Sequence, residues 1–131
     1  MTTFSKRYDL TAEQRSLLRD LIVYMMSQGD TRSKEYPCYS WRSPGREILS
    51  MLNEGKEVEG MDCIVFTMRD AADFCKVVPD ETRDELIRNY ERDKENVGLV
   101  GILSMHTNET IVGLKKVLLG DPVMSSTNNF W

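Results

Sequence analysis

Hydrophobic side chains recur at helical spacing between residues 11 and 28, and this is the clearest pattern in the chain. The apolar positions are Leu17, Leu18, Leu21, Ile22 and Met25, which fall on one face of an α-helix. Thr11 and Gln14 have the spacing of a capping box, in which both side chains satisfy backbone N–H groups of the first turn. Gly29 supplies the left-handed residue that ends many helices. The pattern therefore predicts an amphipathic helix over residues 11–28.

Two further segments show the same period. Ser43 and Pro44 resemble the N-cap and first position of a short helix that ends at Gly55. Its apolar positions are Ile48, Leu49, Met51 and Leu52. Residues 108–119 predict a last amphipathic helix with Ile111, Leu114 and Leu118 on its buried face, which stops at Gly120 before Pro122.

Residues 61–78 and 97–105 are harder to assign, because short apolar runs do not distinguish helices from strands. In the first segment a helical wheel separates charged from apolar side chains. Asp62, Arg69, Asp73 and Lys76 fall on one side, and Cys63, Ile64, Met68, Ala71, Phe74 and Cys75 on the other. We therefore predict a helix there, with a strand over 63–67 as the alternative. For 97–105 helix and strand remain equally open, and Gly98 and Gly101 favour close backbone packing.

Residues 80–95 are densely charged and predict an exposed helix that begins after Pro79. Leu86, Ile87 and Tyr90 mark its narrow apolar stripe. Its carboxylates offer an acidic surface for a basic partner, carried by Asp80, Glu81, Asp84, Glu85 and Glu91.

The segments together predict an all-α fold, a compact bundle of five or six helices. The alternative is an α+β fold with a short sheet from 63–67 and 97–103. No repeat or second composition class divides the chain, so residues 1–131 are interpreted as a single globular domain with flexible ends at 1–8 and 123–131.

Composition narrows the class of protein. Hydrophobic residues make up 40% and charged residues 29% of the 131 residues, as in soluble globular proteins. No apolar run approaches a membrane span, and the first residues lack the apolar core of a secretory signal, so we expect a cytoplasmic protein without a membrane partner. Cys38, Cys63 and Cys75 have no framework spacing and are expected to be free thiols.

Charge is uneven along the chain. Residues 1–50 hold eight Lys and Arg against six Asp and Glu, whereas residues 51–131 hold nine against fifteen, within a net charge of −4. An acidic total disfavours indiscriminate binding to phosphate backbones and suits basic protein surfaces.

The residues of common catalytic and cofactor sites are sparse. His106 is the single histidine, so a zinc site has too few ligands. The chain lacks a phosphate-binding glycine loop and a calcium-loop pattern. Cys38 with His106 is the one thiol–imidazole pair available for nucleophilic chemistry, and nothing in the sequence brings the two together. We therefore predict no cofactor, no metal and no enzymatic activity.

The segment EYPCYSWRSPGRE, residues 35–47, is the best candidate for a binding surface. Arg32, Lys34, Arg42 and Arg46 surround Tyr36, Tyr39 and Trp41. Tyrosine, tryptophan and arginine dominate protein–protein hot spots, and they also suit single-stranded nucleic acid. A third interpretation is that the aromatic rings fold inward and cap the core. Phe130 and Trp131 pose a similar choice at the end of the chain.

The leading hypothesis is a small acidic protein-binding module that regulates or inhibits a larger partner, for instance a nucleic-acid-processing one. Small acidic proteins of phages and mobile elements share this size and charge. Its predicted contact residues are Tyr36, Tyr39, Trp41, Arg42 and Arg46. The alternatives are a nucleic-acid-binding protein that uses the 32–46 loop, and a small enzyme with an unrecognised site. Homo-oligomerisation stays open.

Overall fold

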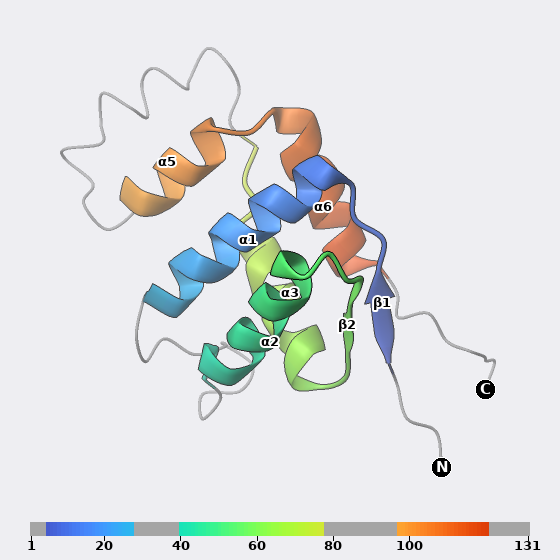
Figure 1. Cartoon of the computed structure of the whole chain (residues 1–131). Helices are drawn as coiled ribbons and strands as arrows, with labels where there is room; N and C mark the ends of the chain where they lie inside the picture. Colours follow the sequence, from blue (N-terminus) through green and yellow to red (C-terminus); the bar gives the residue numbers. More distant parts are fainter. Residues whose placement is uncertain (1–4, 28–39, 78–96, 121–131) are drawn as a thin grey trace.

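The computed structural model describes residues 5–27, 40–77 and 97–120. Within them the chain forms five helices and two short strands (Figure 1). In chain order these are β1 (Lys6–Tyr8), α1 (Ala12–Ser27), α2 (Arg42–Asn53), β2 (Val58–Gly60), α3 (Cys63–Asp73), α5 (Val97–Ser104) and α6 (Asn108–Leu119). The predicted mostly helical fold is confirmed. The predicted helix over 80–95 and the end at 123–131 lie outside the described residues.

Helix α1 is the centre of the fold, and the other helices pack around it (Figure 1). Its capping box forms as expected: the Gln14 backbone N–H donates to Thr11 Oγ1, and the Thr11 N–H donates to Gln14 Oε1, both at 3.1 Å. All five predicted apolar positions, Leu17, Leu18, Leu21, Ile22 and Met25, are fully buried. The periodicity therefore identified the face of α1 that forms the core.

Helix α6 follows its prediction residue for residue. Thr107 is its N-cap, and the Thr107 hydroxyl accepts a hydrogen bond of 3.1 Å from the backbone N–H of Thr110. Ile111, Leu114 and Leu118 are buried against α1 and α3. The helix predicted within 61–78 forms as α3, and the undecided segment 97–105 is helical as α5, so the alternative sheet from 63–67 and 97–103 does not form.

A short antiparallel sheet exists elsewhere, in segments where no strand was predicted. β1 pairs with β2, with Lys6 opposite Gly60 and Tyr8 opposite Val58. Residues 1–8 were expected to be a flexible end, but Tyr8 is 1% exposed and Val58 is fully buried. Three-residue strands carry too little alternation to be recognised, and the pairing joins segments about fifty residues apart in sequence.

Lys6 fastens β1 to the end of α6. Its ammonium group donates to the carbonyl oxygens of Leu118 and Gly120 and lies 4.7 Å from the centroid of the Tyr8 ring. A helix C-terminus has unpaired carbonyl groups and a negative dipole end, so a buried cation there is well placed. Lys6 is accordingly only 5% exposed.

Two details of the predicted helices are corrected. α2 begins at Arg42, with Trp41 in place of Ser43 as its N-cap residue; Ser43 therefore lies inside the first turn. Cys63 was assigned to the buried face of α3 but is exposed; it is the first residue of the helix, and burial begins at the next residue, Ile64. Cys75 is buried as predicted.

Candidate functional site: an acidic groove between α2, β2 and α3

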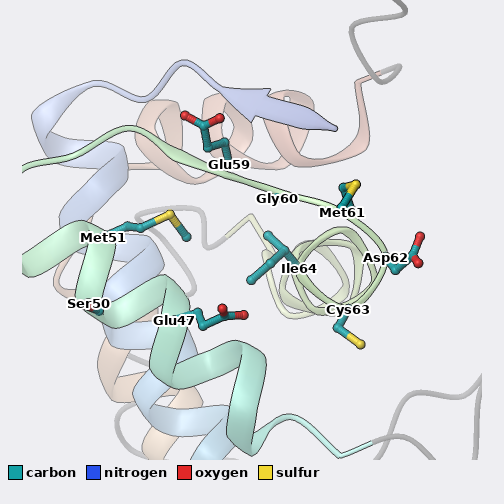
Figure 2. A pocket seen from close by; sticks show the side chains of 9 residues that line it. All are labelled: Glu47, Ser50, Met51, Glu59, Gly60, Met61, Asp62, Cys63 and Ile64. Atoms are coloured by element: carbon teal, nitrogen blue, oxygen red, sulfur yellow. The ribbon is translucent and has the colours of Figure 1, made fainter. Parts of the chain in front are cut away.

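An open groove of about 580 Å³ lies where β2 and the start of α3 face the middle of α2. Its lining residues are Glu47, Ser50, Met51, Glu59, Gly60, Met61, Asp62, Cys63 and Ile64. Figure 2 shows Glu47 and Met51 pointing from α2 toward Ile64 on α3. The groove therefore joins side chains from two helices and the strand between them.

Backbone turns on both sides of β2 create this hollow. Gly55 has φ +73° and follows the end of α2, where a side chain would be strained. After β2 the chain turns sharply at Asp62, whose φ of 34° is rare for a residue with a side chain. α3 begins at the next residue. These turns hold β2 across the open end of the space between α2 and α3.

Gly60 lets β2 approach α3 closely. A Cβ atom built on Gly60 would lie 2.5 Å from Cγ1 and 2.8 Å from Cβ of Ile64. Both distances are well below van der Waals contact, and the Cβ of Ile64 cannot move without its backbone. The absence of a side chain at Gly60 therefore determines the shape of the groove at this point.

Apolar side chains form the floor of the groove. Ile64 is 5% exposed, Met51 is partly buried, and Met61 is 46% exposed. Methionine is unbranched and has a polarizable sulfur, so it adapts to differently shaped apolar groups. The exposed area of Met61 is a contact surface that the core does not use.

The carboxylates among the lining residues belong to Glu47, Glu59 and Asp62, and these three residues are here called the rim of the groove. Figure 2 shows Glu47 pointing toward α3, whereas Glu59 points to the β1 side of β2 and Asp62 points away from α2. Glu47, Glu59 and Asp62 are exposed, and the described lining residues include no lysine, arginine or histidine. Beside the rim, Ser50 Oγ donates a 2.6 Å hydrogen bond to Glu54 Oε2. This bond and the neighbouring Lys56 lower the pKa of Glu54, which keeps that carboxylate charged. The groove therefore combines an apolar floor with a negatively charged edge.

The described lining of the groove has one thiol, three carboxylates and no histidine. Cys63 is its one exposed thiol. His106 lies elsewhere: its Nε2 is 3.1 Å from Asp20 Oδ2, which joins the turn after α5 to α1. Cys38 lies outside the described residues, so its relation to His106 is untested. Among residues 5–27, 40–77 and 97–120, no cluster of three or more His, Cys, Asp or Glu side chains is arranged to hold a metal ion.

Trp41 of the predicted binding loop belongs to the core. It is 3% exposed, its Nε1 donates a 2.8 Å hydrogen bond to Asp70 Oδ2, and its ring packs edge-on against Phe74 with centroids 6.0 Å apart. The prediction of Trp41 as a partner contact is therefore corrected, and for this residue the inward-folded interpretation holds. In this position the indole N–H has a hydrogen-bond acceptor and the large apolar ring is buried.

The other predicted contact residues remain open. Arg42 and Arg46 are exposed on the first turns of α2, one turn apart, and neither lines the groove. Tyr36 and Tyr39 lie outside the described residues. So do the carboxylates of the predicted acidic surface, Asp80, Glu81, Asp84, Glu85 and Glu91.

Sequence reasoning missed the groove, although its signal is present in residues 57–64, EVEGMDCI. This segment alternates carboxylates with apolar residues around a glycine between two predicted helices. The pattern by itself does not indicate a site, because exposed carboxylates and single apolar residues are common between helices. Only the placement of α2 beside β2 and α3 makes these residues line one hollow.

Comparisons with known proteins identify no related protein. No family model matches the chain, and neither the curated proteins nor the solved structures include a significant match. None of the helices in the described ranges has both the length and the apolar character that a bilayer crossing requires.

Proposed function

We propose that this protein is a small binding module whose groove receives a basic segment with apolar anchors from a larger protein. By covering that segment, the module regulates or inhibits its partner. The supporting observation is the lining of the groove: an apolar floor of Met51, Met61 and Ile64 beneath the carboxylates of Glu47, Glu59 and Asp62.

Each part of the lining has a complement in such a segment. Partly exposed methionines accept aliphatic or aromatic anchors of varied shape. Lysine or arginine side chains flanking those anchors would meet the rim carboxylates, which increases the association rate and disfavours acidic competitors. The net charge of −4 acts in the same direction at longer range.

The nucleic-acid alternative is less well supported. Base stacking requires accessible aromatic faces, and the ring of Trp41 is buried. The carboxylates of the groove repel phosphate groups. Arg42 and Arg46 remain exposed, so they are the residues through which that alternative would be tested.

Fluorescence anisotropy with labelled helical peptides tests the proposal. The probe peptide carries leucine at positions i and i+7 and lysine at i+3 and i+4, and a matched peptide carries glutamate in place of lysine. The wild-type protein should bind the lysine peptide with a dissociation constant on the order of 10–100 µM at low salt. Binding of the glutamate peptide should be at least about tenfold weaker.

Matched variants test whether the peptide binds in the groove. Glu47→Gln/Glu59→Gln should weaken binding of the lysine peptide about tenfold, because two negative charges of the groove lining are removed. The control Glu13→Gln/Glu109→Gln removes the same charge from exposed positions on α1 and α6 outside the groove lining and should leave affinity unchanged. Equal affinity for both peptides, or equal loss in both variants, rejects the proposal.

A further inference from the structure

A second surface of the molecule has the composition that the groove is proposed to bind. Val112, Lys115, Lys116 and Leu119 line a shallow depression of about 410 Å³ on α6, together with Gly120. These four side chains stand at positions i, i+3, i+4 and i+7, which is one face of a helix. Leu119 is 53% exposed, and both lysines are exposed. The face is therefore basic with an apolar residue at each end.

This face is available while the protein stays folded. The opposite side of α6 is buried through Ile111, Leu114 and Leu118. Lys6 holds the last carbonyl groups of the helix. α6 is therefore a rigid element that presents one face to the core and a basic, partly apolar face outward, so binding through it requires little ordering.

The α6 face does not fill the groove of its own molecule. β2 pairs with β1 along the edge of the groove, and Lys6 of β1 bonds the end of α6. Figure 2 shows β2 running between the groove and β1. Because α6 packs on α1 and α3, it stays on the β1 side of β2, away from the groove.

We propose that the groove of one molecule receives the α6 face of a second copy. Val112 and Leu119 rest on the methionine floor, and Lys115 and Lys116 meet the carboxylates of Glu47, Glu59 and Asp62. This is the helix-in-groove mode of recognition, with anchors at i and i+7. The inference rests on the proposed function, because it assigns an occupant to the same groove.

The contact is head to tail, so it leaves one groove and one α6 face free at the two ends. Two helical turns cover much less than the roughly 800 Å² per partner of a stable interface, so the association is weak and concentration-dependent. A partner segment that binds the groove competes with the second copy. Self-association therefore restrains the module until a partner is present.

Sedimentation velocity on the full chain, combined with charge-neutralised variants, tests this arrangement. At low salt, the weight-average mass of the wild type should rise between about 10 µM and 1 mM. About 0.5 M salt should reverse the rise, because the Debye length falls well below 10 Å. Lys115→Gln/Lys116→Gln loses the basic face and Glu47→Gln/Glu59→Gln loses the groove, so each alone should remain monomeric.

An equal mixture of the two variants is the decisive sample. One variant keeps an intact groove and the other an intact α6 face, so the mixture should form a one-to-one dimer and stop there. Arg19→Gln/Lys76→Gln matches the charge change of the lysine variant at exposed positions outside both surfaces and should associate like the wild type. Circular dichroism checks that every variant is folded.

The other outcomes overturn the inference. A wild type that stays monomeric at about 1 mM in low salt shows that α6 does not occupy the groove, whereas the proposed function still stands if the lysine peptide binds. Association of the wild type without recovery in the mixture shows a different interface between copies. Addition of the lysine peptide should dissociate wild-type assemblies, and persistence of the assemblies also contradicts the inference.

Discussion

The indole Nε1 of Trp41 donates a hydrogen bond of 2.8 Å to Oδ2 of Asp70, and this bond links the start of α2 to the last turn of α3. The Trp41 ring also packs edge-on against Phe74, which in turn packs edge-on against Tyr24 of α1 at 5.8 Å. Trp41 therefore connects three helices. Trp41 therefore contributes to the stability of the fold, whereas Arg42 and Arg46 are exposed on α2.

Trp41→Ala should lower the free energy of unfolding by about 3–5 kcal/mol, because it removes a large buried ring. Trp41→Phe keeps most of the ring but loses the bond to Asp70, so it should cost about 1–3 kcal/mol. Urea denaturation monitored by circular dichroism measures both. Arg42→Ala, at the exposed neighbouring position, should change stability by less than about 0.5 kcal/mol. A Trp41→Ala protein as stable as Arg42→Ala would place the ring outside the core.

Tyr8→Phe should stabilise the protein by about 0.5–2 kcal/mol. The Tyr8 hydroxyl is buried and has no hydrogen-bond partner among the described residues, so its removal ends a desolvation cost. Burial raises the pKa of Tyr8 above its ordinary value near 10, and Arg69 opposes this in part. Above about pH 10 the unfolded chain ionises this phenol and the folded protein does not, so stability falls as pH rises.

Denaturation curves from pH 7 to 11 therefore distinguish the two tyrosine forms. The wild type should lose stability above about pH 10 faster than Tyr8→Phe does, since phenylalanine has no proton to lose. Parallel losses in both proteins, or a loss of more than about 1 kcal/mol in Tyr8→Phe at pH 7, would show that the hydroxyl is hydrogen-bonded.

Lys6→Met should destabilise the protein by about 1–3 kcal/mol, because the carbonyl oxygens of Leu118 and Gly120 lose their donor. Methionine keeps the length and apolar character of the lysine side chain, so the change reports mainly on the charge and the hydrogen bonds. Lys56→Met is the matched control. Lys56 is bridged to Glu54 at 3.0 Å on the surface, with 69% of its side chain exposed, so its loss should change stability by less than about 1 kcal/mol.

Hydrogen exchange locates the effect of Lys6→Met. The last turn of α6 should exchange faster than in the wild type, because its carbonyl groups are no longer held by β1. Faster exchange throughout the chain with no excess at α6 would contradict a capping role for Lys6.

Gly60→Ala should destabilise the protein by about 1–3 kcal/mol, since a methyl group there overlaps Ile64. The control is Gly101→Ala in α5, where an added Cβ meets no side-chain or remote atom within 4 Å. Alanine favours a helix over glycine, so this control should stabilise by about 0.5–1 kcal/mol. Opposite signs in thermal denaturation are the expected result, and equal signs would reject the close approach of β2 to α3.

Cys63 and Cys75 should differ sharply in reactivity. Cys63 is exposed and Cys75 is buried. Burial raises the pKa of the Cys75 thiol from 9.0 to about 12, and Lys115 opposes this in part. In a Cys38→Ser background, a thiol-specific disulfide reagent at pH 8 should modify one thiol at once and the second only as the protein unfolds. Rapid modification of both thiols in the folded protein would contradict this burial.

The same thiol makes stability depend on pH. Below about pH 9 Cys75 is neutral in both states, and between pH 9 and 12 the unfolded chain ionises while the folded protein does not. Stability should therefore fall across this interval, and Cys75→Ala should lose less. Because Tyr8 acts in an overlapping range, the comparison is best made in the Tyr8→Phe background.

Local signals predicted the helices well. The capping box at Thr11 and Gln14, the buried face of α1 and the buried face of α6 depend on residues three to seven positions apart, which a sequence displays directly. The wheel over residues 61–78 identified α3 in the same way. The wheel assigned Cys63 to the buried side, but Cys63 is exposed because it is the first residue of α3, just before the part of the helix that contacts the core.

Contacts between distant segments were not predictable in this way. The pairing of β1 with β2, the capping of α6 by Lys6 and the bond from Trp41 to Asp70 each join residues far apart in sequence. Their partners are chosen by how the helices pack, and no local pattern specifies that choice. The candidate site shows the same division. Residues 57–64 contain Glu59, Asp62 and Met61 of its lining, but the sequence does not show that they lie beside Glu47 and Met51 of α2.

The sequence by itself therefore determined the helices within residues 11–28, 43–55, 61–78 and 108–119 and most of their apolar faces, because both properties follow from the spacing of side chains along one element. It did not decide between helix and strand for residues 97–105, where α5 forms. Tertiary structure alone decided that Trp41 turns inward, that Lys6 reaches the end of α6, and that Glu47 and Met51 face Ile64 across an open groove. These relationships depend on the distances between elements, and such distances are fixed only when the helices share one core.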